Sequence, residues 1–313
     1  MDRIHDEEVD TSEGVLRSLL RDQRPDWAGL PASRIDATGT SNTLWRLQTR
    51  PQRPDVVVRL PRQVGADAAV AAEVELLPAL GQSPLASAVT LPVVAHRGVP
   101  SRSYPMAWMA AEWLDGDDLW THRGFAAADT RLAVELADAV RTIAALAEVS
   151  APARRTGERG GPFNGVIERL RRWLDDPGWN AAALLDLPAV RRLADHAVDL
   201  TGETAPVTFT HGDLIPGNIL VDDEGRLAAI IDWGGAGFGD PAQDLAPAWS
   251  IFGPTARQVF RDRVDTDDAT WHRACITELE HAVGGVLYYR PRKHPLGDVM
   301  AATLARILDD AAV

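Results

Sequence analysis

Short apolar segments in the N-terminal third of the chain are separated by turn residues and by two stretches of helical spacing. The segments bounded by Gly, Pro or Asn predict strands at residues 34–49, 55–61, 88–98 and 105–116, the first of which folds back on itself. Gly39 permits a positive φ at that tight turn. The helical stretches are residues 11–22 and 66–80. This third should therefore form a mostly antiparallel sheet with one inserted helix.

The rest of the chain repeats its apolar residues at a spacing near 3.6. Residues 129–149 show this most clearly, with Asp129 as a plausible N-cap and one apolar stripe made by Leu132, Leu136, Val140 and Ile143. Similar patterns occur at 164–174, 188–200, 271–289 and 297–310. We expect an α+β fold with a β-rich N-terminal lobe, a connection near 111–116 and a larger, mainly α-helical C-terminal lobe. Clefts between such lobes are favoured ligand sites.

Composition narrows the functional class. The 313 residues are 45% apolar, with a net charge of −13 and a pI near 5.0, which disfavours a nucleic-acid binder. The acidity suits a cationic small substrate, and it equally suits plain solubility. Cys275 is the single cysteine, so an internal disulfide and a cysteine-based zinc site are excluded. The acidic start and the lack of a long apolar run predict a cytoplasmic protein that does not enter a membrane.

Residues 210–235, "THGDLIPGNILVDDEGRLAAIIDWGG", carry the candidate chemistry. If the apolar runs on either side of "DDEG" form a hairpin, Asp232 lands at a level between Asp213 and Asn218, within roughly 10 Å of each along the strands. Carboxylate and amide oxygens of this kind suit Mg²⁺, which keeps waters and takes phosphate oxygens as further ligands. Asp and Asn beside Pro-Gly are also ordinary turn residues, and that interpretation stays open here.

The spacing His-x-Asp, Asn five residues after the Asp, and then a strand ending in Asp resembles the catalytic and metal loops of protein-kinase-like folds. The wording of residues 211–246 is similar to the aminoglycoside phosphotransferase family, which includes choline-kinase-like and macrolide kinases. The likeness extends to "GTSNTLWRL", "VVVRLPR", "EWLDG" and "LYYR", and it covers nearly the whole chain.

The resemblance implies a role for each matching residue. Asp213 would be the catalytic base, Asn218 and Asp232 would hold Mg²⁺, and His211 would support the loop. The turn formed by Gly39, Thr40, Ser41 and Asn42 would lie over the nucleotide phosphates. The adenine edge would meet the carbonyl of Glu112 and the amide of Leu114. Asp240 and Asp244 would brace the loop after the metal aspartate. Residues 1–113 would then be a nucleotide-binding lobe and residues 114–313 a catalytic and substrate-binding lobe.

Two features depart from the kinase pattern. Kinases use a strand lysine to hold the α- and β-phosphates, whereas Arg59 stands at that position and Lys293 is the only lysine of the chain. The guanidinium of arginine stays charged and can form two hydrogen bonds with phosphate oxygens, so Arg59 could neutralise phosphate charge in place of the lysine. Its helix partner is expected to be Glu73, with Glu75 as the competitor. The chain also has no G-x-G-x-x-G loop and no Walker A sequence.

The acceptor is expected to be a small molecule, because only seven residues separate Asp232 from Asp240 and leave no room for an activation segment. The sequence thus predicts a Mg-ATP-dependent O-phosphotransferase, with GTP not excluded and antibiotic resistance as one possible role. Choline, ethanolamine, other metabolites and macrolides are alternative acceptors, and a non-catalytic nucleotide-binding protein or an unrelated α+β binding protein are alternative classes. Candidate acceptor residues in the last helices are Glu278, Glu280, Asp298, Asp309, Asp310, Trp249, Trp271, Tyr288 and Tyr289. The oligomeric state is left undetermined.

Overall fold

The computed structural model describes residues 8–35, 41–49, 53–121, 129–202 and 205–311. The chain forms two compact units. The first consists of Met1–Gly116 and Ala229–Gly235, and the second of Asp117–Ala228 and Ala236–Val313. Asp232 therefore belongs to the first unit, whereas Asp213 and Asn218 belong to the second.

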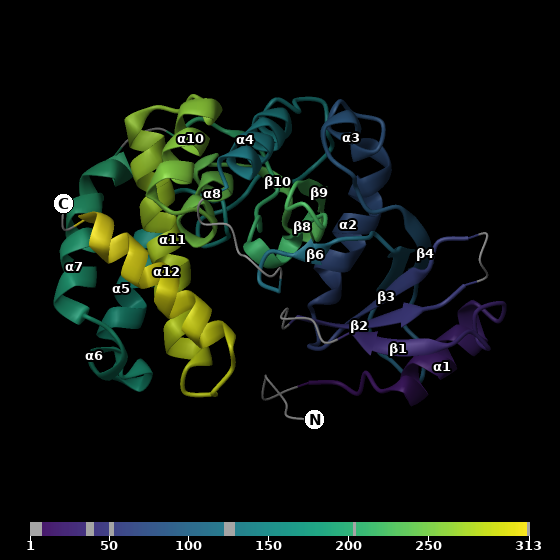
Figure 1. Cartoon of the computed structure of the whole chain (residues 1–313). Helices are drawn as coiled ribbons and strands as arrows, with labels where there is room; N and C mark the ends of the chain where they lie inside the picture. Colours follow the sequence, from purple (N-terminus) through teal and green to yellow (C-terminus); the bar gives the residue numbers. More distant parts are fainter. Residues whose placement is uncertain (1–7, 36–40, 50–52, 122–128, 203–204, 312–313) are drawn as a thin grey trace. The chain divides into compact units, whose positions relative to one another are not determined.

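The first unit is built on a five-stranded antiparallel sheet in the order β1-β2-β3-β5-β4 (Figure 1). Its strands are β1 (Ala32–Ile35), β2 (Asn42–Leu47), β3 (Val56–Pro61), β4 (Val94–Gly98) and β5 (Trp108–Glu112). Its helices are α1 (Glu13–Gln23), α2 (Asp67–Leu80) and the short α3 (Leu85–Ala88). Helix α3 takes up the start of the segment expected as a strand at 88–98, so that β4 begins only at Val94.

The alternation of side chains along β3 decides what each face of this sheet holds. Val56, Val58 and Leu60 join the apolar face of α1 in one buried core, together with Trp45, Leu47 and Trp108. Arg59 lies between two of these positions in the sequence and therefore points to the opposite face, where it contacts Glu73 of α2. Strand β3 thus places the guanidinium of Arg59 beside the buried carboxylate of Glu73 in α2.

Residues 229–235 belong to the first unit because of two local contacts. Ala229 forms a parallel bridge with Thr90, and the amide of Ile230 donates to the Thr90 carbonyl. The short 3-10 helix η4 (Trp233–Gly235) packs on α2, where Gly234 lies so close to the Ala69 backbone that a Cβ atom would not fit. These contacts bring Asp232 to the same helix face as Glu73.

The second unit is mainly helical and is organised around α11 (Asp268–Tyr289), which contacts α5, α8 and α12 (Figure 1). Residues on most sides of α11 are buried, as expected for a central helix. The other helices are α4 (Thr130–Ala144), α5 (Asn164–Asp175), α6 (Ala181–Leu184), α7 (Leu187–His196), α8 (Ala242–Leu245), α9 (Ala248–Ile251), α10 (Pro254–Val264) and α12 (Leu296–Ala311). Three short 3-10 helices also occur, at η1 (Pro177–Trp179), η2 (Ala197–Gly202) and η3 (Pro216–Asn218).

Short strands support the loops of the second unit. β7 (Thr208–Thr210) pairs with β10 (Gly237–Gly239), and β6 (Asp117–Asp118) pairs with β8 (Ile219–Val221). β9 (Leu227–Ile230) follows β8 in the same sheet after a turn in which Gly225 adopts a positive φ of 75°. The α+β class, the antiparallel N-terminal sheet and the helical C-terminal part are confirmed. Asp129 also caps α4 as predicted, accepting hydrogen bonds from the amides of Arg131 and Leu132.

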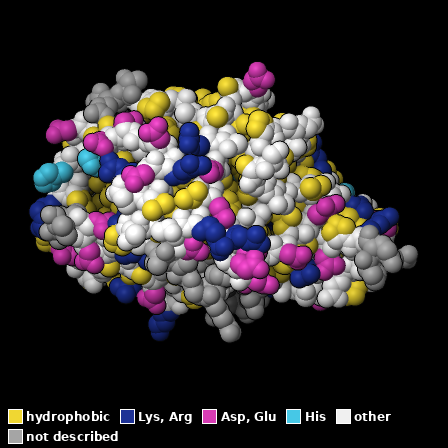
Figure 2. All heavy atoms as spheres, turned by 45° about the horizontal axis from the view of Figure 1, so that its top comes forward, with side chains coloured by type: hydrophobic (Ala, Val, Ile, Leu, Met, Phe, Trp, Pro, Cys, Tyr) yellow, Lys and Arg dark blue, Asp and Glu magenta, His cyan; other side chains and the backbone are white. Residues whose placement is uncertain are grey.

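Two properties of the surface and helices bear on partners. Figure 2 shows acidic and basic side chains interspersed over the face in view, with hydrophobic side chains scattered among them. No helix within the described ranges is long and apolar enough to cross a bilayer.

Candidate functional site

Asp213 lies in the loop that leaves β7, and its side chain is 27% exposed. The loop is tied down by Asp244 of α8, whose carboxylate accepts hydrogen bonds from the amides of His211 (2.6 Å) and Gly212 (2.9 Å). Gly212 has a φ of 81°, a conformation that favours glycine. Burial raises the pKa of Asp244 to about 6, and the two amides oppose the rise. Asp244, the predicted support of this loop, is thus a buried carboxylate that accepts hydrogen bonds from two backbone amides.

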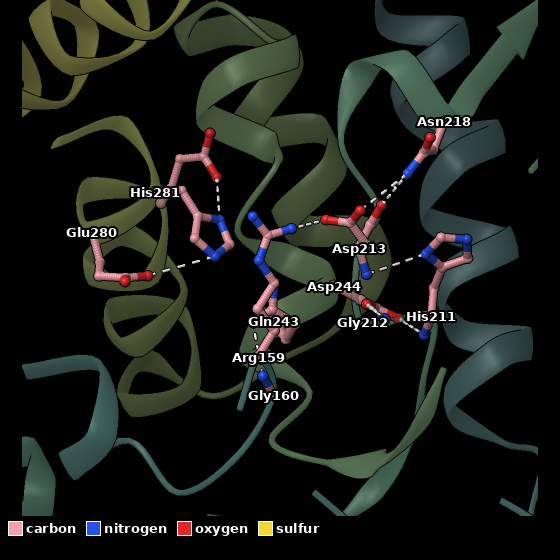
Figure 3. A network of polar contacts seen from close by, with 11 residues as sticks. Arg159, Gly160, His211, Gly212, Asp213, Asn218, Gln243, Asp244, Glu280 and His281 are labelled. Carbon is pink, nitrogen blue, oxygen red and sulfur yellow. Dashed lines mark hydrogen bonds and ion pairs between the residues drawn. The ribbon is translucent and has the colours of Figure 1, made fainter. Parts of the chain in front are cut away.

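Two further side chains hold Asp213 (Figure 3). The Nδ1 atom of the buried His211 accepts a hydrogen bond from the Asp213 amide at 3.2 Å. Asn218 donates through Nδ2 to the Asp213 carbonyl at 2.8 Å and to its carboxylate at 3.4 Å. The turn at Pro216 and Gly217 therefore brings the amide of Asn218 back onto Asp213. The carboxylate remains partly open while the backbone around it is fixed.

Trp120 packs against this turn from the segment after β6. Its ring lies where a Cβ atom of Gly217 would be, so residue 217 must lack a side chain. We expect Gly217→Ala to push Trp120 and the adjacent Asn218 apart, because the ring has no flexible end that could yield. The expected result is a fall in kcat of roughly 10- to 100-fold, together with a higher Mg²⁺ requirement, since an error of about 1 Å can cost this much.

Gly29→Ala is the matched control for this change, because nothing lies near the position of its added methyl group. Steady-state kinetics at varied Mg²⁺ concentration would measure the effect in both variants. A Gly217→Ala enzyme with unchanged kcat and unchanged Mg²⁺ dependence would show that the Trp120 contact does not position Asn218.

Asp240 is also buried and pairs with an arginine far along the chain. Its carboxylate accepts hydrogen bonds from Arg273 of α11 at 2.8 and 3.4 Å and from the Ala242 amide at 3.0 Å. Arg273 is 2% exposed and also donates to Thr270 Oγ1 at 2.9 Å. The pair joins the segment after β10 to the central helix.

The first unit contains a second group of charges, on the face of α2. The guanidinium of Arg59 donates to Glu73 at 2.5 Å and to Asp232 at 2.8 Å. Burial alone would lower the pKa of Arg59, but the two carboxylates raise it above its ordinary value. Burial raises the pKa of Glu73, against the opposing effect of Arg59. The expected partner, Glu73, is confirmed, and the competitor Glu75 instead pairs with Arg97.

Asp232 has a backbone φ of 65°, in the left-handed region that few non-glycine residues adopt. Such strain costs about 1–3 kcal/mol and is concentrated at functional sites. Its carboxylate Oδ1 accepts from Arg59, so the side chain is oriented toward the sheet. This backbone conformation and the Arg59 contact together fix where the Asp232 carboxylate lies.

Oxygen donors of the kind that Mg²⁺ prefers occur in each unit. In the second unit, the amide nitrogen of Asn218 donates to Asp213, so its side-chain oxygen is the atom that could bind a cation. In the first unit, the carboxylate of Asp232 contacts Arg59. Among the described residues no group of three His, Cys, Asp or Glu side chains could hold a metal ion.

The remaining predicted nucleotide contacts are described in part. Gly39 and Thr40 lie outside the described residues. Ser41 is exposed, and its carbonyl accepts from the Arg62 amide at 2.9 Å, while Asn42 begins β2. Glu112 ends β5, with its amide bound to the Val93 carbonyl at 2.9 Å. Leu114 is half-buried just beyond that strand.

Comparison with known proteins identifies the family of this chain. The model of the phosphotransferase enzyme family, APH, matches residues 34–278, more than three quarters of the chain. The chain belongs to this phosphotransferase family. Membership makes the protein an enzyme of the phosphotransferase, or kinase, class, as the loop at Asp213 predicted.

Solved structures of similar fold agree with the assignment. A GDP and kanamycin complex of APH(2")-IIia has a TM-score of 0.71 at 18% identity, covering 95% of this chain and 98% of that one. The macrolide 2'-phosphotransferase MphH from Brachybacterium faecium has a TM-score of 0.60 at 21% identity, covering 93% and 97%. The uncharacterized protein YcbJ of Bacillus subtilis is 46% identical over 46 residues, which is 15% of each chain. The predicted protein-kinase-like fold is confirmed.

Of the acidic residues expected near the acceptor of this phosphotransferase, the two in α11 are buried. Glu280 pairs with Arg169 at 2.8 Å, and burial raises the pKa of Glu278 to about 8. Asp298, Asp309 and Asp310 are exposed, with Asp298 lying 3.5 Å from Arg290 and Asp310 paired with Arg257. The two glutamates of α11 are therefore poorly placed to bind an ammonium group, whereas the three aspartates reach the surface.

The aromatic candidates divide into two groups. Trp249 and Trp271 are buried with ring centroids 4.6 Å apart, so they belong to the core of the phosphotransferase. Tyr288 is half-buried beneath Arg292, near a hollow of about 1000 Å³ whose lining includes Arg290, Lys293 and Asp298. That hollow has a basic rather than an acidic lining.

Sequence reasoning missed two residues that contact the predicted site. Arg159 forms an ion pair with Asp213, and Gln243 holds the loop that carries Arg159. Arg159 lies in a segment whose composition predicts only a loop, and Gln243 precedes Asp244, the predicted brace. The pair of glycines after Arg159, in "ERGGP", was the one available sign of a constrained backbone.

Proposed function

We propose that this phosphotransferase moves the γ-phosphoryl group of Mg-ATP directly to a hydroxyl of a small molecule. The observation that carries the proposal is the partly exposed carboxylate of Asp213, on a backbone held by Asp244, His211 and Asn218. A carboxylate in such a place can accept the hydroxyl proton as the oxygen attacks phosphorus. The bond from the γ-phosphorus to the bridging oxygen breaks, and ADP leaves. Positioning and charge neutralisation supply most of the rate in this chemistry.

The first unit is proposed as the nucleotide-binding part. Arg59 would neutralise phosphate oxygens, and Glu73 would hold its guanidinium in place from the buried side. The segment Gly39–Asn42 would cover the phosphates, and the backbone of Glu112 and Leu114 would meet the base. Asp232 and Asn218 would hold Mg²⁺, which when bound would offset phosphate charge. Reliance on ATP also accords with a cytoplasmic enzyme.

The second unit is proposed to bind the acceptor. An aminoglycoside, as in the kanamycin complex of the similar structure, is one candidate and would connect the enzyme with antibiotic resistance. The burial of Glu278 and Glu280, and the pairing of Glu280 with Arg169, favour a second candidate, an acceptor with fewer ammonium groups. A macrolide is one such molecule, and macrolide phosphotransferases share the fold. Choline, ethanolamine and neutral hydroxyl metabolites are the further members of this class.

The direct test is an ADP-release assay with purified enzyme against aminoglycosides, macrolides, choline, ethanolamine, sugars and amino alcohols. ATP and GTP should be run in parallel, because similar structures hold GDP. The proposal expects Mg²⁺-dependent release with at least one acceptor, and mass spectrometry of a product heavier by one phosphoryl group. Nucleotide binding without transfer to any member of a broad panel would favour a non-catalytic protein.

Arg59→Ala is expected to weaken the use of nucleotide and to leave the KM for the acceptor nearly unchanged. The change removes a charge that is held between Glu73 and Asp232, and hydrogen bonds to charged groups contribute about 1.5–3 kcal/mol. We therefore expect the KM for ATP to rise roughly 10- to 100-fold. Arg59→Lys should lose less, since it retains the charge but not the two-sided geometry.

Arg97→Ala is the matched control for Arg59→Ala. Arg97 also sits on the sheet of the first unit and pairs with a glutamate of α2, but it is exposed. Isothermal titration with a non-hydrolysable ATP analogue would compare the variants. Equal nucleotide affinity in wild type and Arg59→Ala would remove Arg59 from the proposed phosphate site.

A further inference from the structure

Arg159 reaches Asp213 from a separate loop of the second unit. It lies between α4 and α5, and its Nη1 atom forms an ion pair with Oδ1 of Asp213 (Figure 3). The Arg159 side chain is 51% exposed and that of Asp213 is 27% exposed. Ion pairs with this exposure contribute little to stability, about 0–1 kcal/mol. A contribution to the free energy of unfolding therefore does not by itself account for the position of Arg159 beside Asp213.

The loop that carries Arg159 is fixed at its backbone. The amide of Gly160 donates to Oε1 of the buried Gln243 at 2.9 Å, and the Gly160 carbonyl accepts from the Asp240 amide at 2.8 Å. The amide of Gly161 donates to the Glu158 carbonyl at 3.0 Å. Arg159 is thus flanked by anchored residues, and its side chain leaves a defined point.

One short helix positions both partners of the ion pair. Gln243 holds the loop of Arg159, and the next residue of α8, Asp244, holds the amides of His211 and Gly212 ahead of Asp213. Neighbouring side chains of α8 therefore fix the two loops whose tips meet at Arg159 and Asp213. The two charged groups are therefore held by loops that share one anchor.

The other side of Arg159 faces α11. Figure 3 shows the guanidinium between Asp213 and the imidazole of His281, whose nitrogens lie 3.6 Å from Glu278 and Glu280. Burial, followed by the charges of Arg159 and Arg169, lowers the pKa of His281 well below its ordinary range, so the ring is neutral. Glu280 is already paired with Arg169. Burial lowers the pKa of Arg159, and the charges of Glu280 and Glu278 oppose that change. Among the described contacts, the carboxylate that forms an ion pair with Arg159 is that of Asp213.

We propose that Arg159 is the positioning residue of this phosphotransferase for Asp213. The inference rests on the proposed function, in which Asp213 is the base. Arg159 holds Oδ1 of the carboxylate, which fixes the side-chain rotamer and directs the other oxygen toward the acceptor hydroxyl. It acts through Asp213 and contributes to turnover rather than to nucleotide binding.

The test compares Arg159→Ala, Arg159→Lys and the control Arg155→Ala on an acceptor identified by the ADP-release panel. Arg155 is an exposed arginine of the same loop and has no described side-chain contact with Asp213. We expect Arg159→Ala to lower kcat roughly 10- to 100-fold, as misplacement of a catalytic group does, with the KM for ATP changed less than ~3-fold. Arg159→Lys should fall between wild type and Arg159→Ala, and Arg155→Ala should match wild type.

Added guanidinium ion supplies a readout that a purely structural arginine would not give. Because the site is half-exposed, millimolar guanidinium should restore part of the kcat of Arg159→Ala and should leave wild type and Arg155→Ala unchanged. In addition, Arg159→Ala combined with Asp213→Asn should be no slower than Asp213→Asn alone, since a positioning residue has nothing left to position.

The outcomes separate this inference from the proposed function. If Asp213→Asn retains the wild-type rate, the base assignment fails, whatever Arg159 does. If Asp213→Asn is inactive but Arg159→Ala turns over normally, the function stands and the role of Arg159 is overturned. A slow Arg159→Ala enzyme without guanidinium rescue, and with additive loss in the double variant, also overturns it. Circular dichroism and thermal midpoints of Arg159→Ala and Arg159→Lys would show that both are folded.

Discussion

Asp213→Asn is expected to lower kcat by roughly 10²–10⁴-fold, the range seen when a general base is removed. Asparagine has nearly the same shape, so the amide of residue 213 can still donate to His211 and its carbonyl can still accept from Asn218. It has no lone pair basic enough to accept the acceptor's hydroxyl proton, and it forms no ion pair with Arg159. The affinity for Mg-ATP should change less than ~3-fold.

The measurement is steady-state kinetics on the identified acceptor, together with titration of a non-hydrolysable ATP analogue. Asp223→Asn is the control, because it makes the same chemical change at an exposed position in the turn after β8. If Asp213→Asn turned over at near-wild-type speed, another group would have to serve as the base. A loss of nucleotide binding in the same variant would instead point to a structural role for Asp213.

Arg273→Met is expected to destabilise the protein by about 3–5 kcal/mol. The change leaves Asp240 as a buried carboxylate without its charge partner, and an uncompensated buried charge costs about that much. Methionine fills similar space, so the cavity contribution is small. The effect should reach the loop that carries Arg159 as well, because the Asp240 amide donates to the carbonyl of Gly160, next to Arg159.

Urea denaturation followed by circular dichroism would measure this change. Arg172→Met on the exposed face of α5 is the control and should stay within about 0.5 kcal/mol of wild type. Asp240→Asn combined with Arg273→Met should lose less than the sum of the two single changes, since a neutral amide leaves no buried charge. A single Arg273→Met variant as stable as wild type would mean that water or another cation compensates Asp240.

Local patterns predicted what depends on near neighbours in the chain. The apolar stripe from Leu132 to Ile143 identified α4, and the β-branched run stopped by Pro61 identified the strand that places Arg59. The motif at 211–218 predicted that Asp213 and Asn218 lie close together, and the turn at Pro216 and Gly217 brings them into contact. The pairing of Arg59 with Glu73 was implied by the resemblance to kinases, in which a strand cation pairs with an acid on the next helix.

Contacts over long sequence distances could not be predicted in this way. Asp240 meets Arg273 and Arg159 meets Asp213 across separations of 33 and 54 residues, and neither segment carries a pattern that names its partner. Glu278 and Glu280 resembled ligands for a cationic acceptor in the sequence. The packing of α11 buries both glutamates, and Arg169 forms an ion pair with Glu280.

The sequence by itself predicted most elements of this phosphotransferase, the candidate residues of its site and a small-molecule acceptor. Periodicity and turn residues act within a few positions, and the motif at Asp213 is local for the same reason. Only the tertiary structure decided which charges remain available. Burial and ion pairing depend on how the helices pack. That packing brings α8 into contact with both loops and brings Arg159 to Asp213. It also buries the glutamates of α11 and pairs Glu280 with Arg169.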